Sequence, residues 1–286
     1  MSQSQIEKII DNACNEDFAR GDVTTETLIP SSLAGRAIIV AKQDGVLAGA
    51  EVAKIVFVKH DPTMEVEILI EDGKRVKTGD VIMVLNGRVI NILKCERTAL
   101  NFITHLSGIA SLTAKYISKV DGLNVSLADT RKTIPGMRIL EKYAVYAAGG
   151  KSNRPDLACG ILIKDNHLMA LSAKGIGVKE AIEKAKTNKS KLPVTIEVNT
   201  LEQVAQAIEA APNSILLDNM SIADMKKAVD IIPETIKIEA SGNINLDNVR
   251  EVAMTGVDVI SVGALTHSAP ALDFSLEFPV QQQAQE

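Results

Sequence analysis

Polar and charged residues recur in the second half of this sequence at one kind of position, the end of a short apolar segment. The segments cover residues 125–129, 160–164, 194–198, 215–218, 236–240 and 259–262, and the residues that end or follow them are Asp129 with Thr130, Arg131 and Lys132, then Lys164, Glu197, Asp218, Glu239 with Ser241, and Gly263. Because the carboxyl ends of parallel strands converge on the ligand site of an α/β sheet, we expect these residues to meet. Burying so many charges without partners is costly, so the pattern predicts one shared active site.

The charge of this region differs from that of the whole chain, whose formal net charge is −5. Between Asp129 and His167 the sequence has seven cations against four anions, a local excess of three positive charges. The cations are Arg131, Lys132, Arg138, Lys142, Lys151, Arg154 and Lys164. Such an excess suits a small polyanionic ligand. Arg138 and Lys142, four residues apart on a predicted helix over 136–146, are instead expected on a solvated helix face.

Two carboxylates on neighbouring repeats, Glu197 and Asp218, are the metal candidates. Paired carboxylates can hold a hard divalent ion that keeps most of its waters, while nearby cations neutralise phosphates or carboxylates. Two short turns, Ser241-Gly242-Asn243 and Val262-Gly263-Ala264, place small residues where backbone amides can approach a phosphate. The combination predicts binding of a phosphorylated substrate beside a metal.

The elements that would position these residues are repeated strand and helix pairs. The last four apolar segments begin 21, 21 and 23 residues apart, a period that fits one strand, one helix and two loops. Strands that are apolar along their whole length belong to a parallel sheet buried on both faces. Ser221 is expected to cap one helix, and Gly256 to end a helix over 246–255. Six such strands fall short of eight, so we predict an incomplete, open α/β barrel of about six βα units.

The first hundred residues predict a different, mixed α+β domain. A helix is expected over 5–14 and antiparallel strands over 35–40, 45–47, 66–70 and 81–84. From Cys95 to Val120 the apolar residues follow helical spacing, which predicts one long helix or two joined near Gly108. We therefore divide the chain into an N-terminal domain over 1–107, joined by the C-terminal tail 270–286, and a barrel domain over 108–269.

Composition excludes several classes of protein. With 286 residues, 46% of them hydrophobic, the chain is long enough for a sizeable core. The three cysteines, Cys14, Cys95 and Cys159, form no CxxC pair, so they are expected to be small buried residues in a reducing compartment. No segment has the length of a membrane span or the pattern of a signal peptide, which predicts a cytoplasmic protein. Five Phe, three Tyr and no Trp in an acidic chain argue against nucleic-acid binding.

The motifs, taken in order, resemble the quinolinate phosphoribosyltransferase family, also called the nicotinate-nucleotide pyrophosphorylases (carboxylating). The resemblance extends over almost the whole chain and is carried by Gly21-Asp-Val-Thr-Thr25, Glu96-Arg-Thr-Ala-Leu-Asn101, Asp129-Thr-Arg-Lys-Thr-Ile-Pro-Gly136, Leu162-Ile-Lys-Asp-Asn-His167, Leu217-Asp-Asn-Met220, Glu239-Ala-Ser-Gly242 and Ser261-Val-Gly-Ala-Leu-Thr-His267. It implies a magnesium-dependent enzyme of NAD biosynthesis that joins quinolinate to 5-phosphoribosyl 1-diphosphate, releases CO2 and diphosphate, and makes nicotinate mononucleotide.

The resemblance also implies roles for single residues. Arg131, Arg154 and Lys164 would hold the dicarboxylate, with Arg97 reaching in from the other subunit of a homodimer. Lys132 would lie near the diphosphate, and Glu197 and Asp218 near the ribose hydroxyls and Mg2+. The remaining substrate-binding candidates are Thr130, Asn153, Ser241, Gly242, Asn243, Val262, Gly263, Ala264 and His267. His167 is expected to support Lys164, whereas His60 and His105 are expected to be surface or helix residues.

Three departures from the family pattern keep a second function open. Asn153 stands where the family has histidine, Tyr146 where it has arginine, and Asn243 where it has a second glycine. The first two changes remove positive charge from the acid-binding end, which favours a related transferase of altered acid specificity, such as the homologue associated with molybdate transport genes. A third possible function is a carrier module, because the stretch 73–87 resembles the turn-and-strand pattern of biotinyl and lipoyl carrier domains. The missing carrier lysine argues against this function.

Overall fold

The computed structural model describes residues 3–279, so the last part of the predicted tail, 280–286, lies outside the described residues. The described residues divide into two compact units, one with 3–114, 134–149 and 269–279, the other with 115–133 and 150–268. This division differs from the predicted one at 108–114 and at 134–149, which both group with the first unit. Contacts between distant segments decide that grouping, and the sequence motifs did not show them.

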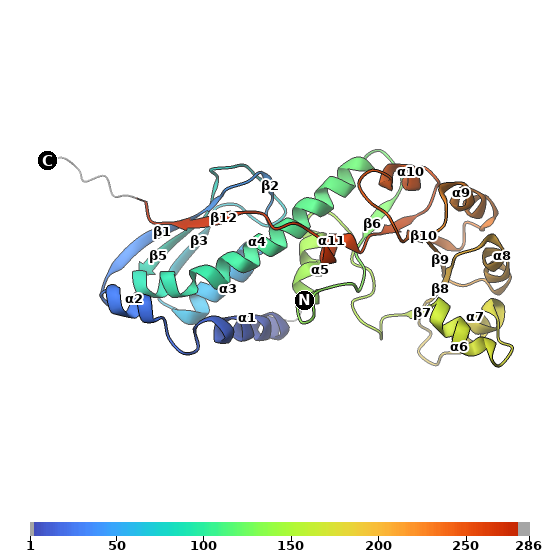
Figure 1. Ribbon diagram of the computed structural model, residues 1–286, viewed down its shortest axis with the longest axis horizontal. Helices are drawn as coiled ribbons and strands as arrows, with labels where there is room; N and C mark the ends of the chain where they lie inside the picture. Colours follow the sequence, from blue (N-terminus) through green and yellow to red (C-terminus); the bar gives the residue numbers. More distant parts are fainter. Residues whose placement is uncertain (1–2, 280–286) are drawn as a thin grey trace. The chain divides into compact units, whose positions relative to one another are not determined.

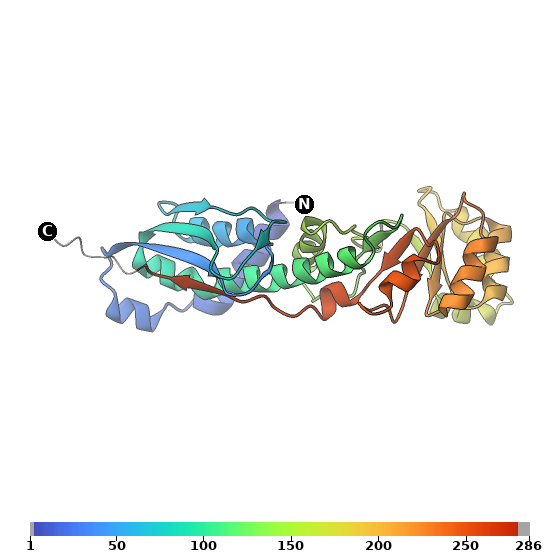
Figure 2. The ribbon, with the colours of Figure 1, turned by 90° about the horizontal axis from the view of Figure 1, so that it is seen from above.

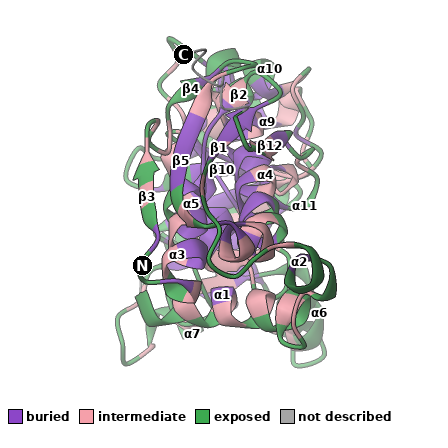
Figure 3. Ribbon diagram, turned by 90° about the vertical axis from the view of Figure 1, so that its left-hand side faces the viewer, coloured by how far each residue is buried: buried purple, intermediate pink, exposed green. Residues whose placement is uncertain are grey.

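The first unit is built on an antiparallel sheet, as predicted for the N-terminal half. Its strand order is β12 (Phe274–Glu277), β1 (Ala34–Ala41), β5 (Val81–Arg88) and β3 (Glu65–Ile68). A separate short pair joins β2 (Gly45–Val46) and β4 (Arg75–Val76). The helices α1 (Gln3–Phe18), α2 (Val23–Leu28) and α3 (Ala50–His60) belong to the same unit. β1 and β5 are buried along much of their length (Figure 3).

The helix α4 (Val89–Lys119) is continuous, which decides between the two predicted possibilities. Gly108 does not interrupt it, because its lack of a side chain serves packing: a Cβ at this position would lie 2.2 Å from the carbonyl oxygen of Pro270. Two serines of the same helix connect it to the segment 46–48. Ser107 Oγ accepts from the backbone N–H of Ala48 at 3.0 Å, and Ser111 Oγ accepts from the backbone N–H of Val46 at 2.8 Å.

The second unit contains the predicted open α/β barrel. Its six strands are all parallel, in the order β6 (Ser126–Ala128), β11 (Val259–Ser261), β10 (Lys237–Ser241), β9 (Ser214–Asp218), β8 (Val194–Val198) and β7 (Ile161–Ile163). From β7 to β11 the neighbouring strands follow chain order, and β6 pairs with β11. A closed barrel would also need β6 to pair with β7. The described residues show no pairing between these two strands. Instead Lys151, in the segment between them, forms a parallel bridge with Ala128.

Helices alternate with these strands, as the repeat period predicted. They are α6 (Asp165–Ser172), α7 (Val178–Lys186), α8 (Leu201–Ala210), α9 (Ile222–Ile231), α10 (Val249–Ala253) and α11 (Ala264–His267). Of these, α7, α8 and α9 pack side by side along one face of the sheet (Figure 1 and Figure 2). Ser221 caps α9 as predicted, its hydroxyl accepting from the N–H of Asp224. α10 begins later than predicted, because the Asn245 side chain accepts from the N–H groups of Asp247 and Asn248 and holds a turn there.

One predicted surface is wrong. The helix α5 (Arg138–Ala147) lies in the first unit with Lys142 only 6% exposed and Glu141 fully buried. Glu141 is buried because both its oxygens have partners: Oε1 lies 2.9 Å from His105 Nε2 on α4, and Oε2 accepts from the N–H of Ile134 at 3.2 Å. His105 thus has a structural partner that the sequence motifs did not indicate. Within residues 3–279, no helix has the length and hydropathy needed to cross a membrane.

The packing at Gly108 can be tested by Gly108→Ala. An alanine in a helix interior is normally favoured over glycine by about 1 kcal/mol. Here its Cβ must displace the Pro270 backbone, so we expect the free energy of unfolding to fall by about 1–3 kcal/mol, the cost of an overpacked contact. Thermal and urea unfolding measure the change, with Ser118→Ala, at an exposed site of the same helix, as control. A more stable Gly108→Ala protein would contradict the contact.

Candidate active site

The strand register places the polar residues predicted to meet on one face of the barrel sheet. Glu197, Leu216 and Glu239 are register neighbours across β8, β9 and β10. One row nearer the carboxyl ends, Asp218 lies beside Ser241, and Ser241 lies beside Ser261 of β11. Register neighbours in a parallel sheet share a face, and so do residues two apart on a strand. The two rows therefore gather three carboxylates and two hydroxyls at one end of one face.

Glu197 lies among charges of both signs. Burial raises its pKa, the Lys164 ammonium, with Nζ 3.9 Å from Glu197 Oε2, lowers it, and the Asp218 carboxylate raises it again. Lys164 begins α6, where its backbone N–H donates to Nδ1 of His167 at 2.9 Å. His167 therefore supports Lys164, as predicted, and it does so through the helix N-cap.

Asp218 is held by an amide that the sequence analysis did not assign. Asn219 Nδ2 donates to Asp218 Oδ2 at 2.7 Å, and Asn219 Oδ1 accepts from Asn243 Nδ2 at 2.9 Å. The chain passes so close here that a Cβ on Gly242 (φ +88°) would lie 2.3 Å from Asn219 Oδ1. Asn243, one of the departures from the family pattern, thus joins the support of a candidate metal ligand.

The described residues form no cluster of three or more His, Cys, Asp or Glu side chains that could hold a metal by themselves. Glu197 and Asp218 nevertheless fit Mg2+, which usually binds one or two carboxylates and completes its shell with water and substrate phosphate. Two carboxylates alone would leave the rest of the Mg2+ shell to water and to a phosphorylated ligand.

Two cations of the predicted site, Arg131 and Arg154, lie near each other. The pKa of Arg154 is lowered by burial and then by the charge of Arg131. The Nε atoms of both arginines are buried and have no hydrogen-bond partner among the described residues. Arg154 also has a left-handed backbone, with φ of 31°. Unused donors on two like charges are suited to a ligand with more than one carboxylate.

Lys132 meets the second glycine turn. A Cβ on Gly263 would lie 3.0 Å from Cδ of Lys132 and 3.1 Å from Nε2 of His267, so the three predicted residues are close together. Thr266 Oγ1 donates to the carbonyl of Lys132 at 2.7 Å, and Thr130 Oγ1 accepts from its N–H at 3.1 Å. Val262 and Ala264 flank this glycine. The arrangement places a cation and an imidazole against a glycine turn.

A cavity of about 240 Å³ lies under the segment 153–160. Its lining includes Asn153, Arg154, Cys159 and Glu239, and burial raises the pKa of Glu239. Cys159 was predicted to be buried, and that is wrong: it is exposed, with Sγ donating to Asp156 Oδ1 at 3.0 Å, because this segment lies at the open side of the barrel. Cys95 is buried and Cys14 is partly buried.

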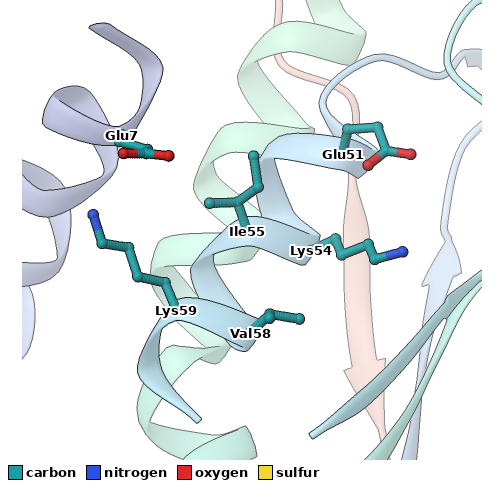
Figure 4. Close-up of a pocket in the computed structure, with 6 residues that line it drawn as sticks. All are labelled: Glu7, Glu51, Lys54, Ile55, Val58 and Lys59. Carbon is teal, nitrogen blue, oxygen red and sulfur yellow. The ribbon is translucent and has the colours of Figure 1, made fainter. Parts of the chain in front are cut away.

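Other candidates lie in the first unit. Arg97 is exposed on α4. A groove of about 330 Å³ between α1 and α3 is lined by Glu7, Glu51, Lys54, Ile55, Val58 and Lys59 (Figure 4). Lys59 Nζ pairs with Asp11 Oδ1 at 2.5 Å, so this groove carries balanced surface charges and none of the predicted site residues.

Together, the open parallel barrel and its mixed cations and carboxylates define an enzyme site for anionic, phosphorylated substrates. Family models of the quinolinate phosphoribosyl transferase N-terminal and C-terminal domains match residues 22–107 and 109–277. A nicotinate-nucleotide pyrophosphorylase [carboxylating] from Mycobacterium leprae is 37% identical, covering 94% of this chain and 95% of its own. A probable one from Bacillus subtilis is 36% identical, covering 100% and 98%.

Solved structures agree. The nicotinate-nucleotide pyrophosphorylase from Francisella tularensis has a TM-score of 0.91 at 36% identity, with 97% of both chains covered. That from Ehrlichia chaffeensis has a TM-score of 0.90 at 37% identity, covering 97% of this chain and 98% of its own. This chain belongs to the quinolinate phosphoribosyltransferase family and is by that membership a phosphoribosyltransferase.

The raised pKa of Glu197 predicts that the ionised side chain lowers the stability of the folded protein. A carboxyl whose pKa is raised on folding opposes folding once ionised; the penalty is absent below its unfolded pKa, near 4.3, and complete above its folded pKa. Glu197→Gln should therefore raise the melting temperature at pH 7.5 by about 2 °C, as about 1 kcal/mol does in a chain of this size. Calorimetry at pH 7.5 and pH 4 measures it. A gain of equal size at both pH values would contradict the charge explanation.

Proposed function

We propose that this chain transfers the phosphoribosyl group of 5-phosphoribosyl 1-diphosphate to quinolinate, with loss of CO2 and diphosphate, and so makes nicotinate mononucleotide for NAD synthesis. The observation that carries the proposal is the pair Arg131 and Arg154, whose buried Nε donors have no partner. Two neighbouring guanidiniums match the two adjacent carboxylates of quinolinate. Family membership and the names of the relatives support the same substrates.

Each group of residues has a part in the reaction. Arg131, Arg154 and Lys164 orient the dicarboxylate, and Lys132 stabilises the departing diphosphate. The turn at Gly263 and His267 lie near the phosphates, and the turn 241–243 offers further backbone donors. Glu197 and Asp218 face the ribose hydroxyls and would hold Mg2+, which when bound supplies charge neutralisation to the diphosphate.

The chemistry needs no nucleophile from the protein. As diphosphate leaves, positive charge develops on the ribose ring, and the pyridine nitrogen of the oriented acid forms the new bond to carbon 1. The ribosylated nitrogen is cationic, so it stabilises the electron pair that stays on the adjacent ring carbon when the carboxylate departs as CO2. A proton from water then adds to that carbon and gives nicotinate mononucleotide. The work of the chain's residues is to position two anions and exclude alternative geometries.

One observation favours the second candidate, a transferase of altered acid specificity. Asn153, which stands in place of the family's histidine, donates through Nδ2 to Glu239 and Ser261, so it does not replace a cationic donor. The pair Arg131 and Arg154 still offers two guanidiniums, which favours the diacid over an acid with one carboxylate.

The deciding experiment offers the protein 5-phosphoribosyl 1-diphosphate with either quinolinate or nicotinate, with Mg2+ or with a chelator. We expect nicotinate mononucleotide and CO2 from quinolinate only, and loss of turnover with the chelator. Product from nicotinate alone would establish the second candidate. Turnover that is unchanged by the chelator would remove Mg2+ and its ligands, Glu197 and Asp218, from the proposal.

We also propose that the protein acts as a homodimer in which Arg97 completes the site of the other subunit. Mixing Arg97→Ala with Lys132→Ala protein should then restore activity, because a hybrid dimer has one site with both residues intact. After full subunit exchange about a quarter of the wild-type activity is expected. Native mass spectrometry verifies the exchange, and hybrids without activity would contradict the shared site.

The guanidinium of Arg154 predicts a selective effect of Arg154→Lys. Lysine keeps the charge but loses the fork that matches a carboxylate, and hydrogen bonds to charged groups are worth about 1.5–3 kcal/mol. We expect KM for quinolinate to rise about tenfold or more, with KM for 5-phosphoribosyl 1-diphosphate nearly unchanged. Steady-state kinetics with each substrate varied in turn measures the difference. Equal changes in both constants would make Arg154 a general electrostatic residue.

A further inference from the structure

A buried carboxyl inside the barrel has no role in the proposed chemistry. Glu239 lies in the middle of β10, where its register neighbours are Leu216 of β9 and Val259 of β11. The inward positions of such barrels are usually filled by branched apolar side chains. Glu239 is only 9% exposed, and a charge buried there is costly unless its partners compensate. Its contacts therefore indicate what the carboxyl is for.

The contacts form a closed triangle of side chains. Glu239 Oε1 accepts from Asn153 Nδ2 at 2.9 Å and from the hydroxyl of Ser261, and Asn153 Nδ2 also lies 3.2 Å from Ser261 Oγ. The two acceptors lie so close together that one N–H of the Asn153 amide can reach both. The Asn153 side chain is thus fixed by the barrel interior.

The main chain of Asn153 is fixed as well. Its N–H donates to Oδ1 of the buried Asp129 at 2.7 Å. The next residue, Arg154, has φ of 31°, in the left-handed region that costs a residue with a side chain about 1–2 kcal/mol. Such a conformation persists where the surroundings hold it. Asn153, anchored through both side chain and main chain, is the neighbour in position to do so.

The anchored turn brings like charges together. Arg154 lies near enough to Arg131 for each charge to oppose the other, and both Nε groups are buried without a partner. Without an anion the guanidinium of Arg154 would gain by turning away. Some part of the protein must hold it in place before the ligand binds.

We propose that Glu239 is a positioning residue of the acid pocket: with Ser261 it clamps Asn153, and the clamped Asn153 keeps Arg154 in the backbone conformation that presents its guanidinium beside Arg131. Asn153 then acts on the acid through Arg154. The inference rests on the proposed function, because it assigns the dicarboxylate to this pocket. It adds a specificity-determining residue beneath the residues that contact the substrate.

Three variants separate this role from simple stability. Glu239→Leu removes the acceptor and fits the apolar neighbours Leu216 and Val259, whereas Glu239→Gln keeps an acceptor oxygen for Asn153. Ser214→Ala is the matched control, because Ser214 is buried on the same face and its Oγ has no partner among the described residues. Circular dichroism and melting temperatures identify any variant that fails to fold.

Calorimetric titration with pyridine-2,3-dicarboxylate and steady-state kinetics give the readout. We expect Glu239→Leu to weaken diacid binding and raise its KM by about tenfold or more, with KM for 5-phosphoribosyl 1-diphosphate changed less than about twofold. For Glu239→Gln the KM for the diacid should stay within about threefold of the wild-type value. Ser214→Ala should have the wild-type KM. In a double-mutant cycle, Glu239→Leu should add almost nothing to Asn153→Ala, because both act through the same turn.

The outcomes distinguish this inference from the function beneath it. If the wild-type protein neither binds the diacid nor turns it over, the proposed function fails and the inference fails with it. If the wild type is active and Glu239→Leu behaves like wild type, or shifts both Michaelis constants equally, only the inference is overturned. If Glu239→Gln is as impaired as Glu239→Leu, the charge of Glu239 acts directly and the clamp is refuted. Additive losses in the cycle would also refute it.

Discussion

Repulsion between Arg131 and Arg154 is the constraint around which the second unit is organised. The Nε atoms of both arginines are buried without a partner among the described residues, and the charge of Arg131 lowers the pKa of Arg154. The dianionic ligand that we propose would relieve this unfavourable interaction. The protein can keep this arrangement because the barrel is open between β6 and β7, and the segment that follows Lys151 fills that side.

The carboxylates at the strand ends are also like charges that lie close together. The Asp218 carboxylate raises the pKa of Glu197, and Lys164 offsets part of this effect. Asn219 and Asn243 hold Asp218 in place, although Asn243 replaces a family glycine. The departure thus keeps the turn, since Asn243 adopts φ of 53°, and adds a hydrogen bond. Each side of the site keeps like charges in close, fixed positions that binding is expected to relieve.

The sequence predicted the parallel barrel well, because strand period and apolar runs are local properties. It also predicted that Lys132 and Gly263 meet, since strand ends converge in any such sheet, and the family resemblance added His267. Lys142 and Cys159 were misplaced, because their exposure depends on tertiary packing that spacing does not show. Glu239 was noticed only as a strand end; its partners Asn153 and Ser261 lie on other elements, and no short motif records such a triangle.

The order of the strands along the chain decides which sheet can be completed first during synthesis. β1 pairs with β12, so the central strand of the first sheet lacks one neighbour until the last described residues have been made, whereas the barrel strands β6 to β11 are all complete before that. During translation the barrel can thus collapse first, while the first sheet waits with one edge of β1 unpaired. Closing a loop of this length carries an entropy cost that grows slowly with length, but contacts so distant in sequence slow folding. The nascent chain therefore exposes an edge strand for most of its time on the ribosome, which makes β1 the segment most in need of protection from aggregation.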